Sequence, residues 1–238
     1  MALITLNRPA VHNAVNEQMM DEWENALDEI AADESIQTII ISAAGESSFC
    51  AGGDLRYFAT LKTAESCRKM SVRMQKILNR LYLGNRFVIA AVNGQALGGG
   101  CEILTACHYR IAADNVSFAF RQAPNGIITG WGGGVRLLRQ LPRSIALRLL
   151  LTGERFSASD ALRFGFIDEI VAPETVLQTA RQLAELTHKN DAAARRIFVQ
   201  LSNRIAQNGS PEISEWETEQ FVNCWMGETF QQILNKFS

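Results

Sequence analysis

The chain has 238 residues, of which 47% are hydrophobic and 20% charged, and its formal net charge is −2. This length fits one domain with a helical appendage, and the small net charge gives no bulk attraction to nucleic acid or to a membrane surface. No apolar run reaches the roughly 20 residues that span a bilayer. Five cysteines without CxxC spacing, and the absence of a signal-peptide pattern, indicate a cytoplasmic protein with reduced thiols.

The first predicted element is a short strand at residues 3–6, which ends before Pro9. A helix follows, because Asn16 is a good N-cap residue and apolar side chains then recur at helical spacing. A β-branched run at 36–42 predicts a buried parallel strand. Next in the chain we expect a loop rich in Gly and Ser at 43–55, a helix at 64–83 that stops at Gly84, and a strand at 87–92.

The second half of the chain begins with a glycine turn and ends in helices. The elements predicted after residue 92 are a helix at 101–108, strands at 109–112 and 116–120, a helix from Ser157 to Gly165, and a strand at 167–171. Beyond them the pattern is almost wholly helical, and Trp216, Phe221 and Trp225 form an aromatic stripe that we expect to pack in the core or against another subunit. Alternating strands and helices predict an α/β domain at 1–172, followed by a helical region at 173–238.

The segment NGQALGGGCE, residues 93–102, places three glycines between a predicted strand and a predicted helix. The first N–H groups of a helix lack partners, and glycine lets them approach a ligand closely, which suits an anion. A P-loop is excluded because Cys101 follows Gly100, and a dinucleotide fingerprint because Ile103 occupies its third glycine position. Glu102 would repel a phosphate, so the pattern favours a neutral substrate that becomes anionic while Glu102 moves a proton. The alternative is that the glycines only permit tight packing and that Glu102 is a surface cap.

A second glycine-bearing loop, FCAGGDL at residues 49–55, follows the predicted strand at 36–42. If this strand and the strand at 87–92 are neighbours in a parallel sheet, both loops emerge at the edge where such sheets bind ligands. One N–H group from each loop could then hold a single oxygen atom.

Four stretches together resemble the enoyl-CoA hydratase/isomerase, or crotonase, superfamily. They are LNRP at 6–9 with Asn13-Ala14 beyond it, FCAGGDL at 49–55, AAVNGQALGGGCE at 90–102, and Gly126-Ile127-Ile128 leading to Gly132-Gly133. The resemblance implies a ClpP/crotonase-like α/β superhelix of repeated ββα units, a C-terminal region that caps the core or forms trimer contacts, and a homotrimer or dimer of trimers. The resemblance implies that the substrate is an acyl-CoA thioester, which brings coenzyme A as part of the substrate, and that no metal or redox cofactor is needed. It implies no nucleic acid and no membrane as partner.

The resemblance also assigns roles by motif position. It makes the N–H groups of Ala51 and Gly99 the two donors to the thioester oxygen of an enolate, and Glu102 the acid/base. The second glutamate of the family's hydratases falls on Gln122, which cannot exchange a proton at neutral pH. The remaining positions expected to contact substrate are Gly52, Gly53, Asp54, Leu55, Gly98, Arg121 and Trp131.

The glutamine at position 122 leaves three functions open. Hydratase/isomerase-type chemistry with Glu102 as the single acid/base comes first. The second is a methylmalonyl- or ethylmalonyl-CoA-type decarboxylase, in which Arg121 binds a substrate carboxylate; the Gly130-Trp131-Gly132-Gly133 run resembles that of the family's ethylmalonyl-CoA decarboxylases. The third is an acyl-CoA-binding protein without catalysis.

Overall fold

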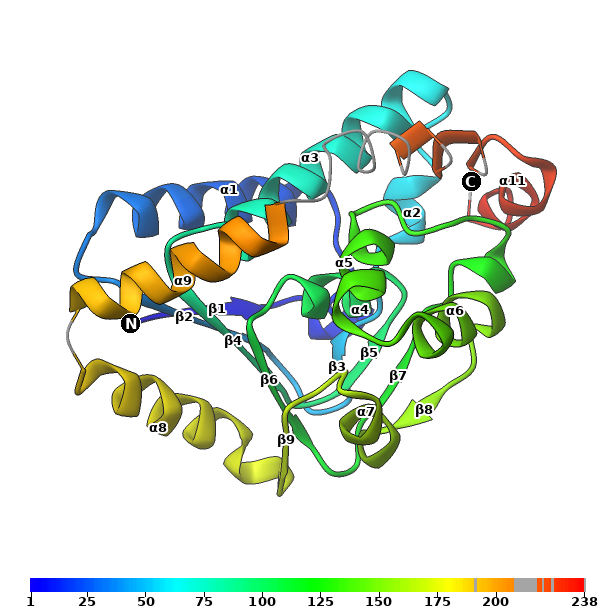
Figure 1. The fold of residues 1–238 in the computed structure, drawn as a ribbon. Helices are drawn as coiled ribbons and strands as arrows, with labels where there is room; N and C mark the ends of the chain where they lie inside the picture. The colour runs from blue at the N-terminus through cyan, green and yellow to red at the C-terminus, as the bar shows by residue number, and fades with distance from the viewer. Residues whose placement is uncertain (191, 208–217, 220, 224, 238) are drawn as a thin grey trace.

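The computed structural model describes residues 1–190, 192–207, 218–219, 221–223 and 225–237, and its strands form two sheets (Figure 1). The larger sheet has the order β1-β2-β4-β6-β9, and every neighbouring pair is parallel. Its strands are β1 (Ala2–Leu6), β2 (Thr38–Ala43), β4 (Phe87–Val92), β6 (Tyr109–Ala113) and β9 (Glu169–Val171). The smaller sheet has the order β3-β5-β7-β8 and contains β3 (Ser48–Cys50), β5 (Gln95–Leu97), β7 (Ser117–Ala119) and β8 (Phe156–Ser157).

Successive strands alternate between the two sheets. β2, β4 and β6 belong to the larger sheet, and each is followed by a short strand, β3, β5 or β7, of the smaller sheet. Helices follow these pairs: α2 (Leu55–Phe58) and α3 (Ala64–Tyr82), then α4 (Gly99–Thr105), then the 3-10 turn η2 (Ala123–Asn125) and α5 (Gly133–Gln140). This is the repeated ββα unit that the family resemblance implied. The strands β3 and β5, however, lie where we expected only a loop and a glycine turn.

Helix ends follow the predicted local signals. Asn16 caps α1 (Glu17–Ala32), because its Oδ1 accepts the N–H of Met19 at 3.0 Å. Ser157 caps α7 (Ala158–Phe164), and Gly165 ends it with φ of +77°. The other helical segments are η1 (Pro9–Val11), α6 (Arg143–Thr152), η3 (Pro173–Thr175), α8 (Val176–His188), α9 (Ala192–Gln207) and α11 (Glu228–Leu234). None of the helices in the described residues is long and apolar enough to cross a bilayer.

The C-terminal helices cover two different parts of the core. α8 packs against β2, β4 and β6 on one face of the larger sheet, whereas α11 lies beside α2 and η2 (Figure 1). Phe221 and Trp225 are buried, as predicted for the aromatic stripe, while Trp216 lies outside the described residues. The ring of Trp225 packs on Phe58 of α2 with 4.7 Å between ring centroids, so the end of the chain is joined to the loop region after β3.

Candidate active site

Three loops meet at one edge of the smaller sheet. β3, β5 and β7 are parallel neighbours, so the segments that follow them emerge on the same side. A cavity of about 140 Å³ lies there. The predicted site residues that line it are Ala51, Gly52, Gly53, Leu55, Gly98, Gly99, Glu102, Arg121, Gln122 and Trp131.

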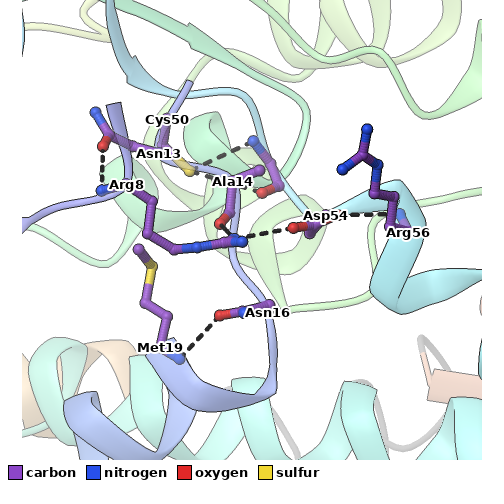
Figure 2. Close-up of polar contacts among 9 residues, drawn as sticks. Arg8, Asn13, Ala14, Asn16, Met19, Cys50, Asp54 and Arg56 are labelled. Carbon is purple, nitrogen blue, oxygen red and sulfur yellow. Dashed lines mark hydrogen bonds and ion pairs between the residues drawn. The ribbon is translucent and has the colours of Figure 1, made fainter. Parts of the chain in front are cut away.

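Asp54 does not line the cavity, but it fixes the loop that does. Figure 2 shows the guanidinium of Arg8 between the carbonyl oxygen of Ala14, at 2.5 Å, and Oδ2 of Asp54, at 2.9 Å. The other carboxylate oxygen of Asp54 accepts the N–H of Arg56 at 3.0 Å and so caps α2. Arg8 of the LNRP motif and Asp54 of FCAGGDL therefore form an ion pair, which fixes the backbone of the loop that contains Gly52 and Gly53.

The N–H of Ala51 does not face the cavity. It donates to the carbonyl oxygen of His12 at 3.0 Å, and the next N–H, of Gly52, donates to Sγ of Cys50 at 3.3 Å. Both groups are therefore used within the protein, which is not the arrangement we predicted for Ala51. Burial raises the pKa of Cys50 to about 12, so its thiol is a neutral packing group rather than a nucleophile.

The N–H of Gly53 has the orientation that we expected for Ala51. Val15 donates its N–H to the oxygen of Gly52 and accepts the N–H of Asp54, both at 2.8 Å, which forms a parallel bridge between Val15 and Gly53. In such a bridge the N–H and C=O of the central residue point away from the partner strand. Within the described part of the chain the Gly53 N–H has no acceptor, and Gly53 lines the cavity.

The second donor comes from the glycine turn before α4. Gly98 has φ of +53° and ψ of −115°, a backbone conformation that side chains disfavour, and its N–H donates to the oxygen of Ala119 at 2.8 Å. Gly99 is the first residue of α4, so its N–H has no acceptor inside the helix. A methyl group on Gly52 would lie 2.9 Å from the nitrogen of Gly99, which shows how closely the two donor loops approach each other.

Glu102 is buried beside these loops, with 2% of its surface exposed, so the surface-cap alternative is wrong. Its Oε2 accepts the N–H groups of Trp131 and Gly133 at 2.8 and 2.9 Å. Its Oε1 accepts Nε2 of Gln122 at 3.0 Å and, in a longer contact of 3.4 Å, the N–H of Gly130. Oε2 therefore has two short bonds, whereas Oε1 has one short bond and one long contact, so Oε1 has the greater capacity for another partner.

The environment of Glu102 suits proton exchange. Burial raises the pKa of its carboxyl group, while the N–H groups of Gly133 and Trp131 and the guanidinium of Arg136 lower it to a smaller extent. Among the described residues that line the cavity, Glu102 is the only carboxylic acid. A buried carboxyl group with a raised pKa at the side of a cavity is a strong candidate for a general acid/base.

Sequence reasoning missed the aromatic wall of the cavity. Phe58, Phe221 and Phe230 all line it, and all three pack on the ring of Trp225. Phe221 and Phe230 come from the C-terminal region, so this part of the chain contributes to the site. Position in an aromatic stripe predicts burial, but it does not tell a core residue from one that faces a cavity.

Arg121 lines the cavity but is anchored elsewhere. Its side chain is exposed, and its Nη1 donates to the carbonyl oxygen of Gly153 at 3.0 Å, just beyond the end of α6. The guanidinium is therefore not held ready inside the cavity for a substrate carboxylate.

Comparisons with known proteins identify the family of the chain. The family model for enoyl-CoA hydratase/isomerase matches residues 1–238. The short-chain-enoyl-CoA hydratase of Clostridium acetobutylicum is 35% identical over 237 residues, which cover 100% of this chain and 90% of the relative. The crotonyl-CoA hydratase of Syntrophomonas wolfei is 31% identical over 237 residues, covering 100% and 91%.

Solved structures show the same fold. A carnitinyl-CoA hydratase from Mycobacterium avium has a TM-score of 0.80 and 34% identity, covering 96% of this chain and 88% of its own. The predicted crotonase-type fold is thus confirmed, and the match extends through the C-terminal helices. The chain is an acyl-CoA-processing enzyme that belongs to the enoyl-CoA hydratase/isomerase family.

Proposed function

We propose that this enzyme hydrates short-chain 2-enoyl-CoA thioesters, with Glu102 as the only acid/base. The oxygen of water bonds to Cβ of the enoyl group as Glu102 takes a proton from that water. The electrons of the double bond move toward the thioester oxygen, giving an enolate that the N–H groups of Gly53 and Gly99 stabilise. Glu102 then returns a proton to Cα, which completes the 3-hydroxyacyl thioester.

One observation carries this proposal: two N–H groups without acceptors in the described residues lie on adjacent loops that line the same cavity as a buried carboxyl group. Main-chain donors placed where negative charge develops are among the largest contributions to catalysis, about 10² to 10³ in rate for each donor.

Gln122 completes the arrangement without exchanging protons. Its Nε2 donates to Glu102, and its buried Oε1 has no hydrogen-bond partner among the described residues. An ionised carboxylate only accepts hydrogen bonds, so the amide nitrogen must face Glu102 and the amide oxygen is left to accept one. Neither an enoyl chain nor a thioester carries a donor. We therefore assign the nucleophilic water to a position where it donates to Oε1 of Gln122.

A short acyl chain suits the size of the cavity. Its 140 Å³ are bounded by Phe58, Trp131, Phe221 and Phe230, which leave room for a few carbon atoms beyond the thioester. Two of the relatives described above are named as short-chain-enoyl-CoA and crotonyl-CoA hydratases. Decarboxylation is less well supported, because Arg121 is exposed and bound to Gly153.

Liquid chromatography coupled to mass spectrometry of a panel of CoA thioesters tests the proposal, because the chromatography separates double-bond isomers of equal mass. We expect 2-butenoyl-CoA to gain one water, with slower conversion of longer 2-enoyl chains because the cavity beside the aromatic wall has a volume of only about 140 Å³. The panel also contains a 3-enoyl-CoA, methylmalonyl-CoA and ethylmalonyl-CoA. Loss of carbon dioxide from a malonyl-type thioester, or double-bond migration without hydration, would replace hydration with one of those reactions.

Assembly into a homotrimer or a dimer of trimers stays a prediction. Large apolar side chains on α8 and α9 are exposed in the single chain, namely Leu186, Ile197, Phe198 and Leu201. Exposed apolar groups of this kind are typical of surfaces that are covered in an assembly.

A further inference from the structure

The peptide group between Gly130 and Trp131 is bonded at both ends to polar groups. Its N–H, from Trp131, donates to Oε2 of Glu102 at 2.8 Å. Its carbonyl oxygen, from Gly130, accepts Oγ of Ser71 at 2.5 Å and Nε2 of Gln75 at 3.1 Å. One planar unit thus connects two side chains of α3 with the carboxylate, although within the described residues no hydrogen bond joins α3 directly to the Glu102 carboxylate.

We propose that Ser71 and Gln75 are positioning residues for Glu102, acting through the Gly130–Trp131 peptide. Because a peptide group is planar, fixing its C=O also fixes the direction of its N–H. Donors on the carbonyl oxygen also polarise the peptide, which makes the N–H a stronger donor to the carboxylate. Neither residue lines the cavity, so this role differs from contact with substrate.

The burial and bonding of the two side chains fit this role. Ser71 is completely buried and Gln75 is 8% exposed, although both are polar residues in the middle of an amphipathic helix. Buried polar groups are retained where their hydrogen bonds are satisfied. Nε2 of Gln75 also donates to Oγ1 of Thr218 at 2.7 Å, so its amide is held in place by the same C-terminal region that supplies the aromatic wall.

A substitution on α3 changes the hydrogen bonding around Glu102 but not the charge near it, as the groups that face Glu102 show. Its carboxylate receives N–H groups from the 130–133 turn and the neutral amide of Gln122, and the charged group near it is the guanidinium of Arg136 on α5. On its own helix the neighbouring Cys101 is a neutral thiol, because burial raises its pKa. α3 presents only neutral groups to the Gly130 carbonyl, so removing them changes hydrogen bonding without removing a charge.

The test is the double variant Ser71→Ala with Gln75→Met. Losing both donors weakens the bond from Trp131 to the ionised form of Glu102, so the pKa of Glu102 should rise by about one unit. The acid limb of kcat/KM for enoyl-CoA hydration should move to higher pH by the same amount. At the pH plateau, kcat should fall about threefold to tenfold because the carboxylate is less well oriented, with KM changed less than twofold.

The matched control is Ile77→Val, a buried position on the same helix without a bond to Gly130. It lowers the stability of the core but should leave the acid limb in place. The inference rests on the proposed role of Glu102, so its pKa is also measured by carboxyl ¹³C NMR, assigned with Glu102→Gln, which needs no turnover. An unchanged Glu102 pKa in the double variant, or an equal shift in Ile77→Val, overturns the role of α3 even if hydration is confirmed.

Discussion

Replacing Glu102 by glutamine should lower kcat/KM for enoyl-CoA hydration by about 10³-fold or more, while the protein still folds and binds acyl-CoA. General acid/base groups contribute about 10² to 10⁴ in rate, and here one residue performs both proton transfers. The cavity contains no other carboxylic acid in the described residues that could replace it. An amide cannot take a proton from water at neutral pH.

The structure explains why this variant should fold. The new amide oxygen can accept the N–H groups of Trp131 and Gly133, as Oε2 of Glu102 does. The new NH₂ then faces Gln122, whose amide can turn to present its oxygen. Glu102→Ala, in contrast, leaves those buried N–H groups unpaired, at a cost of about 1–3 kcal/mol for each unsatisfied group. The comparison of the two variants separates lost chemistry from lost stability.

The pH profile provides a second readout of Glu102. Hydration requires its ionised form, so kcat/KM falls as pH decreases through its pKa. Because burial raises that pKa, the acid limb should lie above the range of an ordinary glutamate. Glu34→Gln, at an exposed glutamate, is the matched control and should leave both rate and profile unchanged. Full activity of Glu102→Gln would remove this residue from the mechanism.

Adding a single methyl group at Gly99 should lower kcat/KM by about 10²- to 10³-fold, the loss typical of one misplaced enolate donor. The Cβ of Gly99→Ala would lie 2.3 Å from Cζ3 and 2.6 Å from Cη2 of the Trp131 ring. That ring is 3% exposed, and its Nε1 donates to Sδ of Met70 at 3.3 Å. The ring has little room to retreat, so the first turn of α4 must shift and carry the Gly99 N–H with it.

A double variant shows whether this clash is the cause. Trp131→Phe removes the outer ring atoms that the new methyl group meets but keeps the main-chain N–H that holds Glu102. Alone it should change kcat/KM less than tenfold. Combined with Gly99→Ala it should recover most of the lost activity, since contacting residues show strong non-additivity. A double variant as inactive as Gly99→Ala alone would show that the loss has another origin.

Much of the fold could be predicted because its signals are local. Asn16, Ser157 and Gly165 predicted helix ends from capping chemistry, and a β-branched run at 36–42 and an apolar run at 87–92 predicted the strands β2 and β4 of the larger sheet. The strands β3 and β5 were missed because they lie between Gly-rich turn signals, and β8 because its two residues are too few to show an alternating pattern. Their absence from the prediction hid the fact that a second sheet delivers the site loops.

The candidate site could be predicted only to the level of its loops. The motif FCAGGDL pointed to the correct loop, but only the bridge to Val15 shows that the N–H of Gly53, and not that of Ala51, faces the cavity. Likewise, the carboxylate of Glu102 was predictable from the motif, whereas its main-chain donors come from residues 28 to 31 positions away. Such long-range contacts leave no periodic signal in a single sequence.

A crystal structure with butyryl-CoA, a saturated thioester that cannot be hydrated, tests the central claim most directly. The two main-chain nitrogens of Gly53 and Gly99 should both lie within about 3.2 Å of the thioester oxygen, with Cα of the acyl chain facing Oε1 of Glu102. A thioester oxygen bound away from both glycines, or held by the Ala51 nitrogen instead of that of Gly53, would contradict this account of the site.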